Sequence, residues 1–133
     1  MLFETTGERS PEPRAVLGAA DLMGMQALVR RLPVGDSVVE AILRLVRSAR
    51  PGPEADPKLA ALIAWGPGPR ASQALMLTTR ARALIEGRLA PSIEDVLALA
   101  EPVLQHRMAL TFAARAEGLG VRDVIGRLKA AIG

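Results

Sequence analysis

The sequence predicts an all-α fold, a compact bundle of five or six helices. Half of the 133 residues are apolar, yet only Phe3, Trp65 and Phe112 are aromatic. The core must therefore be built from Ala, Leu, Val and Ile, a mixture that favours closely packed helices. Apolar residues recur at helical spacing in several segments, and no set of strands, repeat or low-complexity tract is visible. Helices of this kind bury their apolar faces against one another in a bundle.

The chain divides into a short lead-in segment, residues 1–18, and a helical domain, residues 19–133. Gly7, Pro11 and Pro13 prevent a long element from forming in the lead-in segment. Apolar residues open the chain without a helix cap, so we expect the sequence to be a piece of a longer protein. A length of 133 residues fits one domain with a sizeable core.

Two helices are predicted before the first proline-rich connection. The first covers residues 19–32, carries its apolar side chains on one face and ends before Pro33. The second covers residues 36–50, with Asp36 or Ser37 as its cap. The apolar faces consist of Leu22, Met25, Leu28 and Val29 in the first helix and of Val38, Ile42, Leu45, Val46 and Ala49 in the second, where Glu40, Arg44 and Arg47 face water.

The longest helix is predicted in the middle of the chain. Pro and Gly make residues 51–57 a surface connection, and a short turn of helix follows at residues 58–64. The long helix begins within the Gly-Pro segment at residues 66–69 and runs to Glu86, after which Gly87 supplies a left-handed stop. Its core-facing side chains are expected to be Ala71, Leu75, Thr78, Ala81 and Ile85.

Two more helices are predicted in the last third of the chain. Ser92 and Asp95 form a near capping box at the start of one, which Pro102 interrupts or kinks before a restart through His106. Residues 108–112 form a brief extended stretch, and the final helix covers residues 121–132. The inward-facing residues are expected to be Ile93, Val96, Leu97 and Ala100, then Val124, Ile125, Leu128 and Ala131.

Several kinds of chemistry have no support in the sequence. The absence of Cys excludes disulfides, thiolate metal sites and cysteine nucleophiles, and a single His leaves no zinc site. No G-x-x-x-x-G-K-[ST] loop is present, so the chain is not expected to be an enzyme by itself. Glu94 and Asp95 lie in the first turn of a helix, where the dipole stabilises acids, and a structural role is favoured over catalysis. His106 beside Arg107 is interpreted as a capping or packing residue in preference to an acid–base group.

The location and charge of the protein follow from composition. No apolar run is long enough to cross a membrane, and the amino terminus lacks the features of a signal peptide, so we expect a cytoplasmic protein without a membrane partner. The net charge of +3 is small and spread along the chain. It is weak evidence for nucleic-acid binding, which requires a clustered basic face.

The segment from Gly66 to Ser72 carries the most chemical information. Alternating Gly and Pro hold the backbone in a set shape, and Pro69 at the first helical position leaves Arg70 in the opening turn. A phosphate bound there would be contacted by the backbone N–H groups and by the guanidinium, which makes Arg70 a candidate phosphate-binding residue. An arginine that simply extends into solvent explains the same residues, and the residues alone favour this second interpretation.

The order of several segments resembles the carboxy-terminal lid of MoxR-family AAA+ ATPases, and the resemblance covers nearly the whole chain. Five weak motifs occur in sequence at suitable separations, and two shorter stretches match the region that follows the nucleotide-binding core in that family. The segments are Ser37–Pro51, Gly66–Ser72, Ala81-Arg82-Ala83 with Gly87-Arg88, Glu94-Asp95-Val96 and Val103–Met108, preceded by Thr5-Thr6-Gly7 and Gln26–Val29.

The resemblance implies a function for Arg70. In the family, the Pro-Arg pair at the start of the lid helix is the sensor 2 element, whose arginine approaches the terminal phosphate of ATP. This assigns ATP sensing to Arg70, with Pro69, Gly68 and, more weakly, Ala71 beside it. The departure from the family pattern is Gly68, which stands where a serine is common and replaces a side-chain cap by a glycine cap.

The resemblance also implies cofactors and partners. ATP and Mg²⁺ belong to the parent protein, with neither expected on this fragment, and the residues 1–18 lead in from a missing amino-terminal AAA+ core. The parent is expected to hydrolyse ATP, to form a ring, commonly a hexamer, and to act in chaperone-like remodelling alongside von Willebrand factor A-domain proteins. The alternative function is a small basic helical module that binds nucleic acid or another protein.

Overall fold

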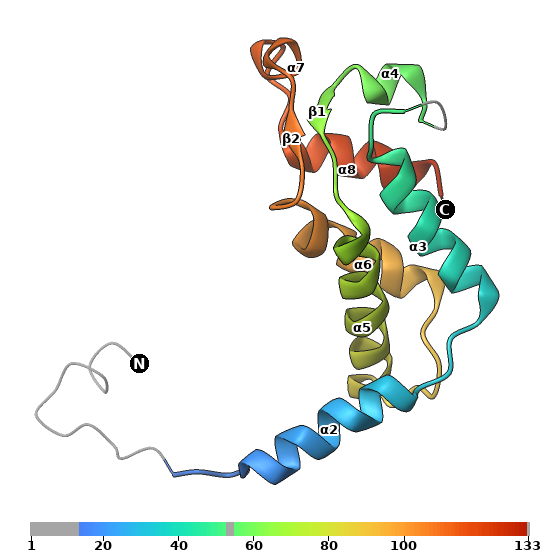
Figure 1. Ribbon diagram of the computed structural model, residues 1–133, viewed down its shortest axis with the longest axis vertical. Coiled ribbons are helices and arrows are strands. Elements are labelled where there is room, and N and C mark those ends of the chain that lie inside the picture. Colours follow the sequence, from blue (N-terminus) through green and yellow to red (C-terminus); the bar gives the residue numbers. More distant parts are fainter. Residues whose placement is uncertain (1–13, 53–54, 133) are drawn as a thin grey trace, which may run out of the picture.

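The structure, a computed structural model, describes residues 14–52 and 55–132 (Figure 1). The described residues form seven helices and one two-stranded antiparallel sheet. The elements are α2 (Ala19–Arg31), α3 (Asp36–Ser48), α4 (Pro57–Ala60), β1 (Ile63–Trp65), α5 (Pro69–Ile85), α6 (Ile93–Leu104), β2 (Ala109–Leu110), α7 (Phe112–Ala116) and α8 (Val121–Ala130). Most of the predicted lead-in segment, residues 1–13, lies outside the described residues.

The core lies between α3, α5, α6 and α8, which pack directly against one another. All five predicted apolar positions of α3 are buried, because their spacing places them on one face of the helix. The predicted bundle is therefore confirmed, with the short helix expected after the proline-rich connection present as α4, while α7 and a small sheet add to it. The largest fully buried apolar side chains are Ile42, Leu45, Leu75, Val96, Leu104, Val124, Ile125 and Leu128.

The buried face of α5 differs in part from the prediction. Ala71 and Leu75 are buried as expected, but Ile85 is 86% exposed, and Thr79 and Ala83 are buried in its place. The core therefore follows a four-residue spacing along one stripe of the helix. Thr79 can lie in this stripe because its hydroxyl donates to the carbonyl of Met76 at 3.2 Å. The other two predicted positions, Thr78 and Ala81, are half-buried, and the predicted stop at Gly87 is confirmed by its φ of 73°.

The predicted helix at residues 58–64 is wrong beyond Ala60. Residues 63–65 instead form β1, which pairs with β2 in the register Ile63 with Leu110 and Trp65 with Ala109. These strands are too short and too far apart in the chain for a local pattern to reveal their pairing. The extended stretch expected at residues 108–112 is confirmed for β2, but Phe112 begins α7, whose first turn is capped when the Thr111 hydroxyl accepts from the Ala114 N–H.

The last two long helices follow the prediction with small corrections. Pro102 lies inside α6 and does not interrupt it, and the helix ends at Leu104, so His106 lies in the following turn. Val96 and Ala100 are buried, and Ile93 and Leu97 are half-buried. The final helix buries Val124, Ile125 and Leu128 and ends at Ala130, which leaves Ala131 exposed.

Helix α2 lies against α5 at one end of the bundle and extends away from it (Figure 1). The predicted helix is confirmed, but none of its residues is buried, and Leu22, Met25 and Leu28 are about half exposed. Its apolar face is therefore largely uncovered in this chain. Within the described residues, none of the helices has both the length and the apolar character needed to cross a membrane.

Candidate functional site

A rigid bend at residues 66–68 connects β1 to α5. A Cβ added to Gly66 would lie 2.0 Å from the carbonyl oxygen of Ala49, so only glycine fits at this position. Pro67 is fully buried, and Ala49 itself is part of the core at the end of α3. The bend is therefore held against α3, and it fixes where α5 begins.

Helix α5 starts at Pro69, with Gly68 in extended conformation and without a side-chain cap. The Ala71 N–H donates to the carbonyl of Gly68 at 2.9 Å, and Pro69 has no N–H to offer. An anion at this helix start would therefore depend on the guanidinium of Arg70 more than on backbone donors. The Arg70 residue is exposed, at the open face of the bend.

The residues of the bend line an open surface pocket of about 450 Å³, which we call the bend pocket. It includes Arg70, to which the family resemblance assigns phosphate sensing, together with the neighbouring Gly68, Pro69 and Ala71. It also includes residues from β1 and from the turn after α6, which the sequence did not connect with this site. The lining residues are Gly66, Gly68, Pro69, Arg70 and Ala71 from the bend and α5, Trp65 from β1, and His106 and Arg107 from the turn after α6.

The His106 and Arg107 pair closes the carboxyl end of α6. Arg107 donates from Nη1 to the carbonyl of Val103 at 2.7 Å, and the same nitrogen contacts Nε2 of His106. A cation at the end of a helix satisfies terminal carbonyls and suits the dipole there. The predicted capping role thus falls on Arg107, while exposed His106 lies beside it. The adjacent basic residues after α6 were the available sequence signal, but nothing local could place them next to Arg70.

Among the described residues that line the bend pocket, none has an acidic side chain. Within residues 14–52 and 55–132, neither Arg70 nor Arg107 forms an ion pair, whereas Arg82, Arg88 and Arg122 do. The pocket therefore presents uncompensated positive charge. Such a surface suits a phosphate or another compact anion.

The opposite end of α5 is fixed by a buried carboxylate. Asp95 is 2% exposed and accepts from Nη1 and Nη2 of Arg88, at 2.8 and 2.7 Å. It also accepts from the Ser92 N–H at 2.8 Å, which confirms the predicted capping box. The hydrogen bonds from Arg88 hold the pKa of Asp95 below its usual range despite its burial. Asp95 therefore has the structural role that the sequence indicated.

The pKa values of the neighbouring acids reflect their hydrogen bonds. Hydrogen bonds from Arg88 and then Arg82 lower the pKa of Glu86, and a hydrogen bond from Ser92 lowers that of Glu94. No group of three or more His, Cys, Asp or Glu side chains in the described part of the chain is arranged to hold a metal ion. The charged residues at this end of α5 therefore support the fold.

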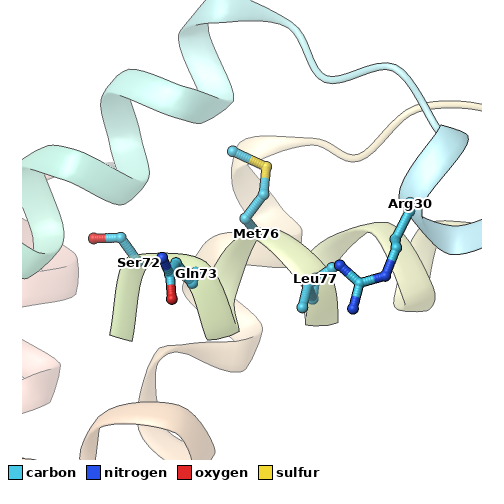
Figure 2. Close-up of a pocket in the computed structure, with 5 residues that line it drawn as sticks. All are labelled: Arg30, Ser72, Gln73, Met76 and Leu77. Atoms are coloured by element: carbon cyan, nitrogen blue, oxygen red, sulfur yellow. The ribbon is translucent and has the colours of Figure 1, made fainter. Parts of the chain in front are cut away.

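A second open pocket, which we call the α2–α5 groove, runs between the two helices (Figure 2). It has a volume of about 600 Å³ and mixes apolar and polar side chains. Arg30 reaches from α2 toward α5, where its guanidinium ends beside Leu77 in this view, and Met76 adds apolar surface (Figure 2). Ser72 and Gln73, two and three residues after Arg70, complete it, so the groove and the bend pocket are lined by neighbouring residues of α5.

Comparison with known proteins identifies the family to which this helical fold belongs. The AAA lid domain family matches residues 59–127, which is more than half of the chain and includes the bend, α5, α6 and most of α8. The chain is 29% identical over 123 residues to Chaperone MoxR1 of Mycobacterium tuberculosis, covering 92% of this chain and 33% of that protein. It is 29% identical over 117 residues to the uncharacterized protein YeaC of Bacillus subtilis, covering 88% of this chain and 34% of that one.

A solved structure shares the fold. The crystal structure of a proposed ATPase from Cytophaga hutchinsonii superposes with a TM-score of 0.74 at 25% identity, covering 82% of this chain and 33% of that chain. This chain thus spans about a third of the length of the relatives it matches. The chain belongs to the AAA lid domain family, and its resemblance to the lid of MoxR-type AAA+ ATPases is confirmed.

Proposed function

We propose that this chain is the sensor 2 lid of a MoxR-type AAA+ ATPase and that Arg70 contacts the terminal phosphate of ATP. The observation that carries the proposal is the position of Arg70, exposed at the start of α5 in a pocket whose described lining residues include no acidic side chain. Its guanidinium can grip phosphate oxygens through paired hydrogen bonds. Gly68 and Pro69 position the residue, since they set the direction in which α5 leaves the bend.

The residues of this chain suit the phosphates of ATP better than its metal. Mg²⁺ prefers carboxylate and other oxygen ligands, and the bend pocket is lined by no carboxylate. We therefore assign Mg²⁺ and the attacking water to an amino-terminal ATPase core of the parent protein. In this division of roles the lid contributes charge that stabilises the phosphates, and the core contributes the metal and the hydrolytic groups.

The α2–α5 groove is the surface on which we place that core. The matched relatives are about three times as long as this chain, so most of their sequence lies outside the region aligned here. The exposed apolar side chains of α2 and the apolar wall of the groove would be covered by such a domain. Because Ser72 and Gln73 of the groove follow Arg70 closely in α5, a core seated there would lie near Arg70. Ring assembly, chaperone-like remodelling and a von Willebrand factor A-domain partner belong to the same proposal.

The test is substitution of Arg70 in the full-length parent protein. We expect Arg70→Ala to lower ATP turnover at least about tenfold, because a charge-assisted contact to the phosphates is lost. The matched control is Arg127→Ala, which removes an exposed arginine of α8 that does not line the bend pocket. It should leave turnover unchanged. Circular dichroism should show both variants folded. Unaltered turnover in folded Arg70→Ala would remove Arg70 from the proposed role.

A further inference from the structure

We propose that His106 and Arg107 form a second cationic arm of the bend pocket, so that a polyphosphate is held from both sides. This inference rests on the proposed role of Arg70 and extends it to residues outside the bend. Arg70 lies at the amino end of α5, and the second arm lies in the turn that follows the carboxyl end of α6. The two helices pack directly against each other, which keeps the arms in a fixed relation.

The orientation of Arg107 is set before any ligand arrives. Its Nη1 is held by the carbonyl of Val103 and by Nε2 of His106. A guanidinium has five N–H donors, so those on Nε and Nη2 remain for an anion. Little side-chain entropy is then lost on binding, because the arginine is already anchored by the end of α6.

His106 adds a further donor. Nη1 of Arg107 contacts Nε2 of His106, and because a guanidinium only donates, a hydrogen bond between them requires Nε2 to accept, which leaves Nδ1 as the ring donor. An imidazole N–H and a guanidinium on adjacent residues can contact two oxygens of one phosphate or of neighbouring phosphates. The second arm therefore offers donors for more than one oxygen of a polyphosphate.

Trp65 supplies one wall of the pocket and an optical signal. Its side chain lies in β1 and is 55% exposed, and it is the single tryptophan of the chain. An anion that fills the pocket would change the solvent contact of the indole. Quenching or enhancement of Trp65 fluorescence therefore reports occupancy without a label.

The experiment titrates the 133-residue chain with tripolyphosphate and with ATP, and it follows Trp65 fluorescence and the amide signals of residues 70–72 and 106–108. We expect both probes to shift both sets of signals at millimolar concentration. Arg107→Gln and His106→Ala should each weaken tripolyphosphate binding by about three- to tenfold, the effect of losing one charge-assisted contact at an exposed site. Arg127→Gln is the control and should bind normally.

A variant that keeps the charge guards against a purely structural effect. Arg107→Gln could loosen the end of α6, but Arg107→Lys retains a cation there and should bind more tightly than Arg107→Gln. Equal weakening by both, together with altered signals along α6 in the absence of ligand, would make Arg107 a helix cap alone and overturn the second arm.

The outcomes separate this inference from the role of Arg70. If Arg70→Gln weakens binding and neither substitution in the second arm does so, the second arm is refuted and the role of Arg70 stands. If the second-arm variants bind weakly and Arg70→Gln binds normally, the second arm is supported and the proposed role of Arg70 fails. Binding of ATP without binding of tripolyphosphate, or no response to either, would overturn the polyphosphate assignment.

Discussion

Replacement of Gly66 by Ala tests whether the bend depends on contact with α3. The new Cβ would lie 2.0 Å from the Ala49 oxygen and 2.9 Å from the Ala49 carbonyl carbon, and real Cβ contacts essentially never fall below 3.0 Å. The Cβ and the oxygen must therefore separate by at least 1 Å. Both clashing atoms are backbone, and Ala49 is fully buried, so no side chain can rotate to relieve the overlap.

This geometry sets the magnitude of the effect. Overpacking a core costs about 1 to 3 kcal/mol when side chains can adjust, and a backbone clash should reach or exceed the upper end. We expect Gly66→Ala to lower the free energy of unfolding by about 3 kcal/mol and Tm by at least about 10 °C. Thermal unfolding followed by circular dichroism at 222 nm measures this.

Gly68, two residues away, provides the matched control. Its backbone is extended with φ of −83°, and a Cβ there would meet nothing within 4 Å. Ser at this N-cap position can accept from the first-turn N–H groups, so Gly68→Ser should be neutral or stabilising by a few tenths of a kcal/mol. A Gly66→Ala variant that unfolds within about 0.5 kcal/mol of the wild type would refute the argument that the bend is pinned against α3.

Two further predictions concern the other supports of α5. Asp95→Asn should lower stability by about 1 to 2 kcal/mol at neutral pH, since the buried carboxylate loses its charge-assisted bonds to a partly exposed arginine. The pKa of Asp95 is lowered in the folded state, so the stabilisation is present above the unfolded pKa and is lost as pH falls below about 4. Urea unfolding across this pH range should show that the stability of Asp95→Asn depends less steeply on pH than that of the wild type. An unchanged pH dependence would contradict this prediction. On the helix itself, Leu75→Ala should lower the free energy of unfolding by about 2 to 5 kcal/mol, and Ile85→Ala should lower it by less than about 0.5 kcal/mol in the same assay. The reason is that the Leu75 side chain is fully buried and that of Ile85 is 86% exposed. Equal losses would contradict the buried face of α5 described above.

The sequence predicted those parts of the fold that local patterns determine. The buried stripe of α3, the capping box at Ser92 and the stop at Gly87 all depend on residues within a few positions of one another. The pairing of β1 with β2 joins distant segments, so a helix was predicted across β1. A periodic pattern predicts that Ile85 is buried, but it does not reveal that α5 ends there, beyond the cover of the neighbouring helices.

The candidate site divides in the same way. Arg70 and the bend could be found from the sequence, because Gly, Pro and Arg in that order have local consequences for the backbone and for charge. His106 and Arg107 carried only a weak local signal, since basic residues after a helix are explained by capping. Their position beside Arg70 results from the packing of α5 on α6, which a single sequence does not encode in any short motif.

Both ends of α5 are attached to other helices, and these attachments determine which helices would move with Arg70. At the amino end, the bend is held against α3 through Gly66, and at the carboxyl end Arg88 is bound to the buried Asp95 of α6. A displacement of Arg70 would therefore act on α3, α5 and α6 together. These helices cannot move separately without breaking the Gly66–Ala49 or Arg88–Asp95 contact or opening the core. Helix α2 has no buried residue and lies outside this unit. If Arg70 contacts ATP as proposed, loss of the terminal phosphate would remove a contact from this connected unit of three helices, to which α2 contributes no buried residue.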